Sequence, residues 1–156
     1  MTLQMHLAAS TRATMAAFLK EVEKVPADKL EWSPLDEGRT VLSMVQECGT
    51  LPRYLLGTLT TFEGIREMTE EIMNMYFADC AKLDTLEKAV AEVRTQSEAL
   101  ASRIEALTDE EMARTVYLMR PDPRPIADIA SYHLMNMEYH RGQICYIQTL
   151  YGDKSL

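Results

Sequence analysis

The last part of the chain carries an apolar stripe that only a long helix can place on one face. Its residues recur at alternating spacings of four and three: Ile126, Ala130, His133, Met137, His140, Ile144, Ile147 and Tyr151. This period is typical of one side of an α-helix packed against other helices. A buried imidazole without a partner is costly, so His133 and His140 must find hydrogen-bond partners or bind something. They are two of only three histidines, and the stripe therefore predicts a packed helix that also carries a candidate site.

Three further amphipathic segments predict helices that could cover this stripe. The first spans roughly residues 3–25 and ends at Pro26. The second begins at Thr40, a plausible N-cap, and reaches about Phe62, and its internal Pro52 predicts a kink or a break near residues 49–51. The third follows Asp84 and Glu87, which together resemble a capping box. Its stripe has the regular spacing of a bundle helix: Leu86, Val90, Val93, Ser97, Leu100, Ile104 and Leu107.

The sequence predicts the structure of the connections between these segments, with one exception. Residues 63–84 are ambiguous and are interpreted as one short helix with a connection. Residues 120–125 carry three alternating prolines, which exclude a helix and predict a loop, and the final helix should run from Ile126 to Gly152 at the latest. Strand-like alternation is almost absent. The pattern predicts a single all-α domain over residues 1–156, a four-helix bundle.

The composition excludes several classes of function. A formal net charge of −8 with dispersed basic residues argues against nucleic-acid binding, which needs clustered Lys and Arg. No apolar run approaches the roughly 18 residues that span a bilayer, so no membrane association is expected. Nothing marks export, and we expect a cytoplasmic protein. The three cysteines lack the spacing of a zinc or redox motif, and Cys48 and Cys145 are interpreted as small buried hydrophobes.

Helical geometry decides which polar residues could form one site. Residues seven apart on a helix are separated by about 10 Å along its axis, so His133 and His140 cannot readily share one ion. Residues four apart can, which favours Asn136 with His140. Glu47 is the candidate on the second helix, because its neighbours in the sequence pattern place it on the apolar side. Glu47, Asn136 and His140 are therefore the candidate metal ligands.

Two interpretations of this set stay open. The three side chains could hold a divalent metal, although an amide is a poor ligand for zinc or nickel. Alternatively, Glu47 or a backbone carbonyl accepts a hydrogen bond from His140 and no metal binds.

Three motifs, in order along the chain, resemble those of a known family. They are Trp32-Ser33-Pro34, Gly38-Arg39-Thr40-Val41 and His140-Arg141-Gly142-Gln143-Ile144. On these motifs the chain resembles the DinB/YfiT-like superfamily. The resemblance implies an up-down-down-up four-helix bundle, often a homodimer, with nickel or zinc held by three histidines. The corresponding positions are Glu47, Asn136 and His140, so one of the three histidines is retained.

The resemblance also suggests two hypotheses of function. Some relatives use the metal to activate a low-molecular-weight thiol such as bacillithiol or mycothiol. The first hypothesis is accordingly a metal-dependent thiol transferase with an altered ligand set. The second is a non-catalytic relative that binds a small molecule or forms a dimeric, stress-related assembly. The expected partners are a small-molecule thiol and a second copy of the chain.

Overall fold

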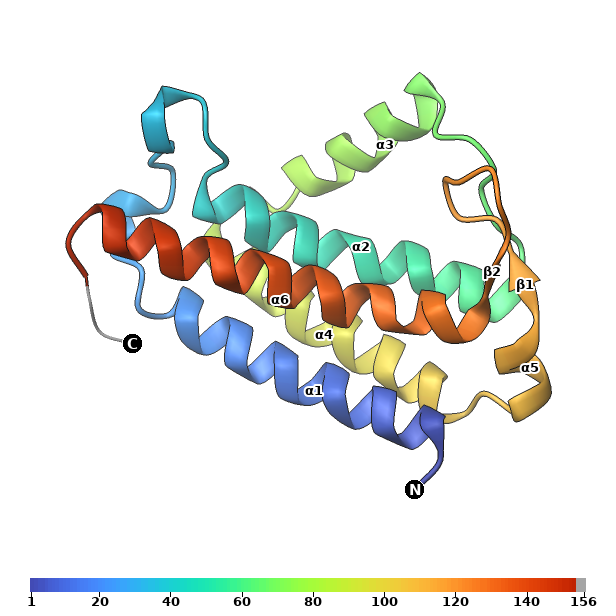
Figure 1. The fold of residues 1–156 in the computed structure, drawn as a ribbon. Coiled ribbons are helices and arrows are strands. Elements are labelled where there is room, and N and C mark those ends of the chain that lie inside the picture. The colour runs from blue at the N-terminus through green and yellow to red at the C-terminus, as the bar shows by residue number, and fades with distance from the viewer. Residues whose placement is uncertain (154–156) are drawn as a thin grey trace.

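Four long helices form the body of the protein. The computed structural model describes residues 1–153, and the last three residues of the predicted domain lie outside this range. The bundle consists of α1 (Leu3–Val22), α2 (Val41–Thr61), α4 (Leu86–Glu105) and α6 (Ile126–Leu150) (Figure 1). Both α1 and α2 pack against α4 and α6. In Figure 1, α1 and α6 run in one direction and α2 and α4 run in the other, which confirms the up-down-down-up bundle.

The shorter elements lie in the connections. Helix α3 (Glu70–Ala81) packs against α2 outside the four-helix body, and the connection that contains it returns the chain to the end where α2 began. Residues 63–84 are thus one short helix with a connection, as interpreted. Two 3₁₀ turns, η1 (Ala27–Lys29) and η2 (Pro34–Asp36), lie between α1 and α2.

The connection between α4 and α6 contains a feature that the sequence pattern did not predict. It begins with α5 (Asp109–Ala113), followed by β1 (Thr115–Val116) and β2 (Arg124–Pro125). The two short strands pair antiparallel, with Thr115 opposite Pro125. The predicted loop over residues 120–125 therefore ends in a strand of two residues.

Both long apolar stripes are buried. On α6, every stripe residue from Ile126 to Ile147 is buried and Tyr151 is half-buried. On α4, Val93, Ser97, Leu100 and Ile104 are fully buried. Full burial of one aliphatic side chain stabilises a fold by about 1.5–3 kcal/mol, so these stripes hold the bundle together.

The helix ends confirm one prediction and correct two, and the interior of α2 bears on another. Thr40 caps α2 as expected, because its hydroxyl accepts from the amide of Ser43 at 3.1 Å. Helix α4 is capped by Thr85 rather than Asp84, since the Thr85 hydroxyl accepts from the amide of Lys88. Helix α1 ends at Val22, three residues before the expected end. Of the kink or break expected near residues 49–51, the break is absent, because α2 continues through Pro52.

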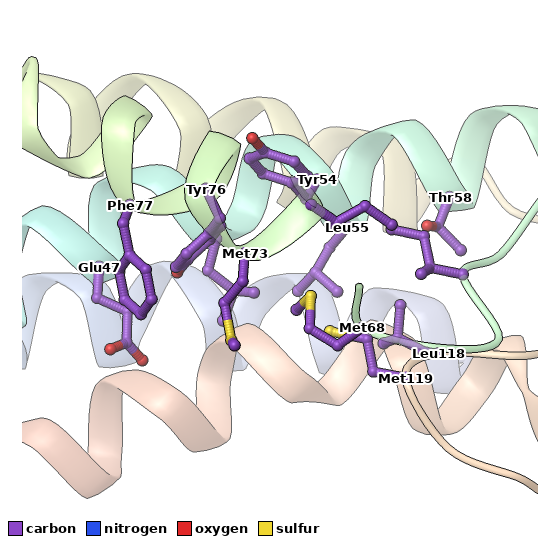
Figure 2. A pocket seen from close by; sticks show the side chains of 13 residues that line it. Glu47, Tyr54, Leu55, Thr58, Met68, Met73, Tyr76, Phe77, Leu118 and Met119 are labelled. Atoms are coloured by element: carbon purple, nitrogen blue, oxygen red, sulfur yellow. The ribbon is translucent and has the colours of Figure 1, made fainter. Parts of the chain in front are cut away.

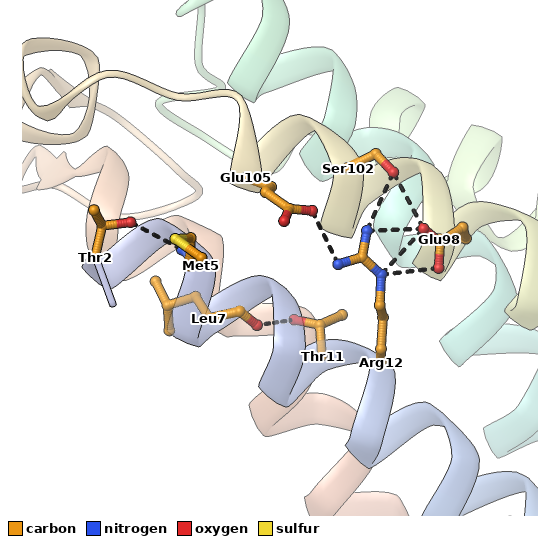
Figure 3. Close-up of polar contacts among 8 residues, drawn as sticks. All are labelled: Thr2, Met5, Leu7, Thr11, Arg12, Glu98, Ser102 and Glu105. Carbon is orange, nitrogen blue, oxygen red and sulfur yellow. Dashed lines mark hydrogen bonds and ion pairs between the residues drawn. The ribbon is translucent and has the colours of Figure 1, made fainter.

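A surface network joins α1 to α4 (Figure 3). The guanidinium of Arg12 donates to Glu98 at 2.8 Å and to Glu105 at 3.0 Å. These hydrogen bonds raise the pKa of Arg12 above its ordinary value. Because the pairs are exposed to solvent and screened, they orient the two helices more than they stabilise them.

Three further features concern the length of the helices, the cysteines and the lone tryptophan. None of the described helices is long and apolar enough to cross a membrane. The three cysteines are free. Cys48 is buried, as interpreted, and burial raises the pKa of its thiol, whereas Cys145 is only half-buried, which corrects that interpretation. Trp32 packs on the end of the core, in edge-to-face contact with Tyr151.

Candidate polar site beside an apolar pocket

The three predicted site residues meet between α2 and α6. Oε1 of Glu47 accepts from the side-chain amide of Asn136 at 3.0 Å and lies 3.1 Å from Nε2 of His140. An ionised carboxylate can only accept, so Nε2 of His140 carries the proton in this contact. His140 is almost fully buried, whereas the Glu47 side chain is 25% exposed. Glu47, Asn136 and His140 therefore lie close together, as the helical spacing predicted.

His133 belongs to a different part of the core. Its Nε2 lies 2.7 Å from the hydroxyl of Ser97 on α4, and both residues are buried. The spacing argument that separated His133 from His140 agrees with this placement. The third histidine, His6, is exposed on α1.

A fourth residue completes the site from the loop before α2. Arg39 donates to Oε2 of Glu47 at 2.5 Å and to the carbonyl of Ser43 at 3.1 Å. The loop is closed by the Ser33 hydroxyl, which donates to the carbonyl of Gly38 at 2.7 Å. A Cβ at Gly38 would lie 2.7 Å from the carbonyl oxygen of Pro34, so the loop needs glycine there. The pairing of Arg39 with Glu47 was not predicted from the sequence.

These partners control the charge of Glu47. Burial raises the pKa of its carboxyl, but hydrogen bonds from His140 and Arg39 outweigh that effect and leave the pKa below its ordinary value. Glu47 is therefore ionised at neutral pH.

The other ring nitrogen of His140 also has a partner. Nδ1 lies 2.7 Å from the side-chain oxygen Oε1 of Gln143, one turn further along the same helix. Arg141 pairs with Glu138, also on α6. Both side chains therefore make these contacts within α6.

The donor set fits a tightly held metal ion poorly. Among residues 1–153, no group of three His, Cys, Asp or Glu side chains could hold a metal. His140 and Glu47 are ordinary ligands for zinc or nickel, but Asn136 is not. The Glu47 carboxylate is also shared with Arg39, whose positive charge opposes a nearby cation. The set fits a divalent ion only as a weakly held one.

An apolar pocket of about 320 Å³ begins at Glu47 and extends beneath α3 (Figure 2). Among the described residues that line it, Glu47 is the one that carries a charge, and most of the others are aliphatic, aromatic or methionine. The lining residues are Glu47, Leu51, Tyr54, Leu55, Thr58, Ile65, Met68, Ile72, Met73, Tyr76, Phe77, Leu118 and Met119. Neither Asn136 nor His140 lines it, so Glu47 connects the polar site to the pocket.

A second, more polar hollow reaches Glu47 from the side of Arg39. It also contains Ser43, Gln46 and Cys80, and it shares Glu47, Tyr76 and Phe77 with the apolar pocket. Glu47 therefore lines both the apolar pocket and this more polar hollow. The sequence pattern could not predict either one, because both depend on where α3 lies over α2.

The orientation of α3 is fixed mainly at its C-terminal end. Asp79 accepts from the hydroxyl of Tyr54 at 2.8 Å and from Arg53 on α2. The ring of Tyr76 meets that of Tyr54 edge to face at 5.4 Å between centroids. No residue of α3 is fully buried, and Met73 is 42% exposed. The N-terminal end of α3 is accordingly the less restrained end of the pocket roof.

Comparisons with known proteins support the fold alone. No protein-family model and no curated protein matches the sequence. Among solved structures, the chain is similar to YfiT from Bacillus subtilis, described as a probable metal-dependent hydrolase with an unusual four-helix bundle topology. The TM-score is 0.71 at 15% sequence identity, over 96% of this chain and 87% of that one. The chain therefore has the four-helix-bundle fold of YfiT.

Proposed function

We propose that this protein binds a small, mainly apolar molecule in the pocket beneath α3, with Glu47 at its polar end. The observation that carries the proposal is the composition of the pocket: about 320 Å³ of apolar space with a single carboxylate at one end. Binding sites for small molecules are typically concave and apolar, with a few placed polar groups.

The carboxylate at the end of the pocket favours one orientation of the ligand. Glu47 is ionised and accepts hydrogen bonds, so a donor group on the ligand, such as an amine, hydroxyl or amide, would face it. The apolar part would lie against Leu51 and Met73. Met68, Met73 and Met119 add flexible side chains that can adapt to different shapes.

A fluorescent probe tests the pocket directly. N-phenyl-1-naphthylamine is apolar, carries one N–H donor, and fluoresces strongly when it leaves water. We expect saturable binding of one probe per chain. Leu51→Trp should fill the pocket and weaken binding by at least about tenfold, which corresponds to about 1.4 kcal/mol.

The matched control is Leu3→Trp, which adds the same side chain at an exposed position of α1. Its affinity for the probe should equal that of the wild type. Equal binding by Leu51→Trp and the wild type would reject the pocket as the binding site.

A second candidate function is a weakly held divalent metal at Glu47, Asn136 and His140. It is supported by the approach of Asn136 and His140 to within 3.0–3.1 Å of one carboxylate oxygen of Glu47. YfiT, of the same fold, is described as metal-dependent. If a metal binds, its charge would favour ionisation of a thiol substrate, which is the chemistry of a thiol transferase.

Zinc titration of tag-free protein tests this second candidate. The wild type should bind weakly, and His140→Ala should abolish that binding. Asn136→His supplies a second imidazole and should raise the affinity at least about tenfold. His6→Ala, at an exposed histidine, is the control. Zinc binding that is unchanged in His140→Ala would place the ion elsewhere and exclude this candidate.

A further inference from the structure

Two arginines lie near the end of the apolar pocket that is opposite Glu47. Glu47 and Thr58 both line the pocket and are eleven residues apart on α2, so the pocket is roughly 16 Å long. Figure 2 shows Glu47 at one end and Thr58 with Leu118 at the other. Past Met68 and Met119 the pocket adjoins an open hollow, which those two methionines line together with Arg66, Glu67, Arg120 and Pro121. The pocket therefore extends from a carboxylate towards two guanidinium groups.

Most arginines of this acidic chain pair with carboxylates, but those at this end do not. Among residues 1–153, six of the ten arginines form ion pairs with Asp or Glu. The four without such a partner in this range lie in the connections after α2 and after α5, at one end of the bundle (Figure 1), and are Arg66, Arg114, Arg120 and Arg124. These connections also carry Glu63, Glu67 and Asp122, which leaves them a net charge of +1 in a chain of −8.

Backbone contacts join the two connections beside the hollow. The amide of Met119 donates to the carbonyl of Ile65 at 2.6 Å, and Ile65 forms a parallel bridge with Leu118. A Cβ at Gly64 would overlap the carbonyl of Tyr117, so glycine permits the close approach of the two backbones. The segments that carry Arg66 and Arg120 are thus held next to each other before any ligand binds.

The guanidinium of Arg66 is restrained without being neutralised. Its Cζ lies 4.1 Å from the centroid of the Tyr117 ring, a cation–π contact. Neither Arg66 nor Arg120 donates a side-chain hydrogen bond to another described residue. Between the pocket and Arg120, Met119 has a φ of 54°, a conformation that is uncommon outside glycine and gathers at ligand sites. The hollow therefore offers fixed donors that lack an acceptor.

We propose that the ligand of the pocket is an alkyl chain that ends in a carboxylate, bound by Arg66 and Arg120. The inference rests on the proposed function and adds the class of ligand. Planar guanidinium groups match a carboxylate, which accepts hydrogen bonds on both oxygens. A hydroxyl at the other end of the chain donates to Glu47. A separation of roughly 16 Å exceeds the Debye length at physiological salt, so Glu47 repels the bound carboxylate little. An ω-hydroxy acid of about ten carbons has this length.

Two ligands that differ only at one end isolate the contribution of the carboxylate. They are 10-hydroxydecanoate and the neutral 1,10-decanediol, each titrated by calorimetry into the full chain. The wild type should bind both. The double variant Arg66→Gln with Arg120→Gln should weaken binding of the acid by at least about fivefold, as expected for two solvent-exposed ion pairs, and leave the diol unchanged. Glu67→Gln removes the carboxylate of the hollow and should strengthen binding of the acid by about twofold.

The matched control is Lys88→Gln with Arg94→Gln, which removes two exposed positive charges from α4. Its affinity for both ligands should equal that of the wild type. An equal loss in the control, or no loss for the acid in the arginine variant, would overturn this inference and leave the pocket intact as a binding site. Binding of N-phenyl-1-naphthylamine without binding of either alkyl ligand would have the same meaning. If none of the three compounds binds, both this inference and the proposed function are rejected.

Discussion

At the residue scale, the two buried histidines of α6 have contrasting surroundings. His140 has a partner at each ring nitrogen, namely Glu47 and Gln143. His133 has Ser97 at Nε2, and its Nδ1 has no hydrogen-bond partner among the described residues. Burial lowers the pKa of His133 from 6.5 to about 4. His133 is therefore neutral in the folded protein at any pH above that value, and it behaves as a structural residue of the core.

This lowered pKa predicts a loss of stability in mild acid. Between pH 6.5 and about 4 the unfolded chain binds a proton at His133 that the folded chain does not. The free energy of unfolding should consequently fall as the pH falls through this window, with a contribution of about 2 kcal/mol between pH 7 and pH 5. Urea unfolding at both pH values measures it.

The double variant His133→Leu with Ser97→Ala is the control. It removes both polar partners, so stability at pH 7 should change little. The difference in unfolding free energy between pH 7 and pH 5 should shrink by about 2 kcal/mol. An equal pH dependence in the wild type and the double variant would show that His133 is not the group responsible.

The individual site residues were predictable to different degrees. Glu47 and His140 could be found because a charged or polar side chain on an apolar helical face is a visible exception to the pattern. Arg39 could not, because its contact with Glu47 depends on how the preceding loop folds. That loop includes Leu35 and Asp36 at positive φ, which no helical or strand periodicity indicates.

At the scale of elements, glycine has opposite roles in α2 and α6. A Cβ at Gly49 would lie 3.1 Å from Cδ1 of Leu83 and 3.3 Å from Cβ of Glu92, so α2 is close to its neighbours there. A Cβ at Gly142 would have open space. Glycine therefore permits close packing of α2 against its neighbours, whereas on α6 it lies at the surface with open space beside it.

The two glycines predict different effects of alanine. Gly142→Ala should raise the free energy of unfolding by about 0.5–1 kcal/mol, because alanine favours the helix and meets no obstacle. Gly49→Ala should give no such gain, since its neighbours would have to move. Urea unfolding of dilute protein, at sub-micromolar concentration, compares the two. A similar gain in both variants would contradict the close approach at Gly49.

The cap of α4 gives a second prediction at this scale. Thr85→Ala removes the hydroxyl that accepts from the amide of Lys88 and should lower the free energy of unfolding by about 1 kcal/mol. Asp84→Ala removes only an exposed pair with the Lys88 side chain and should have little effect. Thermal unfolding of both variants decides between them, and the reverse order of effects would favour Asp84 as the cap.

The bundle helices were predictable because burial on one side imposes a period of 3.6 residues on the sequence. This explains why the stripes of α4 and α6 located two helices almost to the residue. Helix α3 lacks that signal, because none of its residues is fully buried. It could be anticipated as a short helix, but its position over α2 could not.

At the scale of the whole molecule, the four-helix body and the pocket are built from different parts. The body consists of α1, α2, α4 and α6, whereas the pocket lies between α2, α3 and the loops that carry Met68 and Met119. The fold could be predicted from helical stripes and a resemblance. The pocket could not, because it depends on the contact between Asp79 of α3 and Tyr54 of α2, residues far apart in the sequence.

In our proposal, this pocket is the ligand-binding site of the protein. A crystal structure of the protein with N-phenyl-1-naphthylamine tests it most directly. We predict one probe molecule between α2 and α3, in contact with Leu51 and Met73 and with its N–H directed to Glu47. A probe bound only elsewhere on the molecule, with the pocket beneath α3 empty, would contradict the proposal.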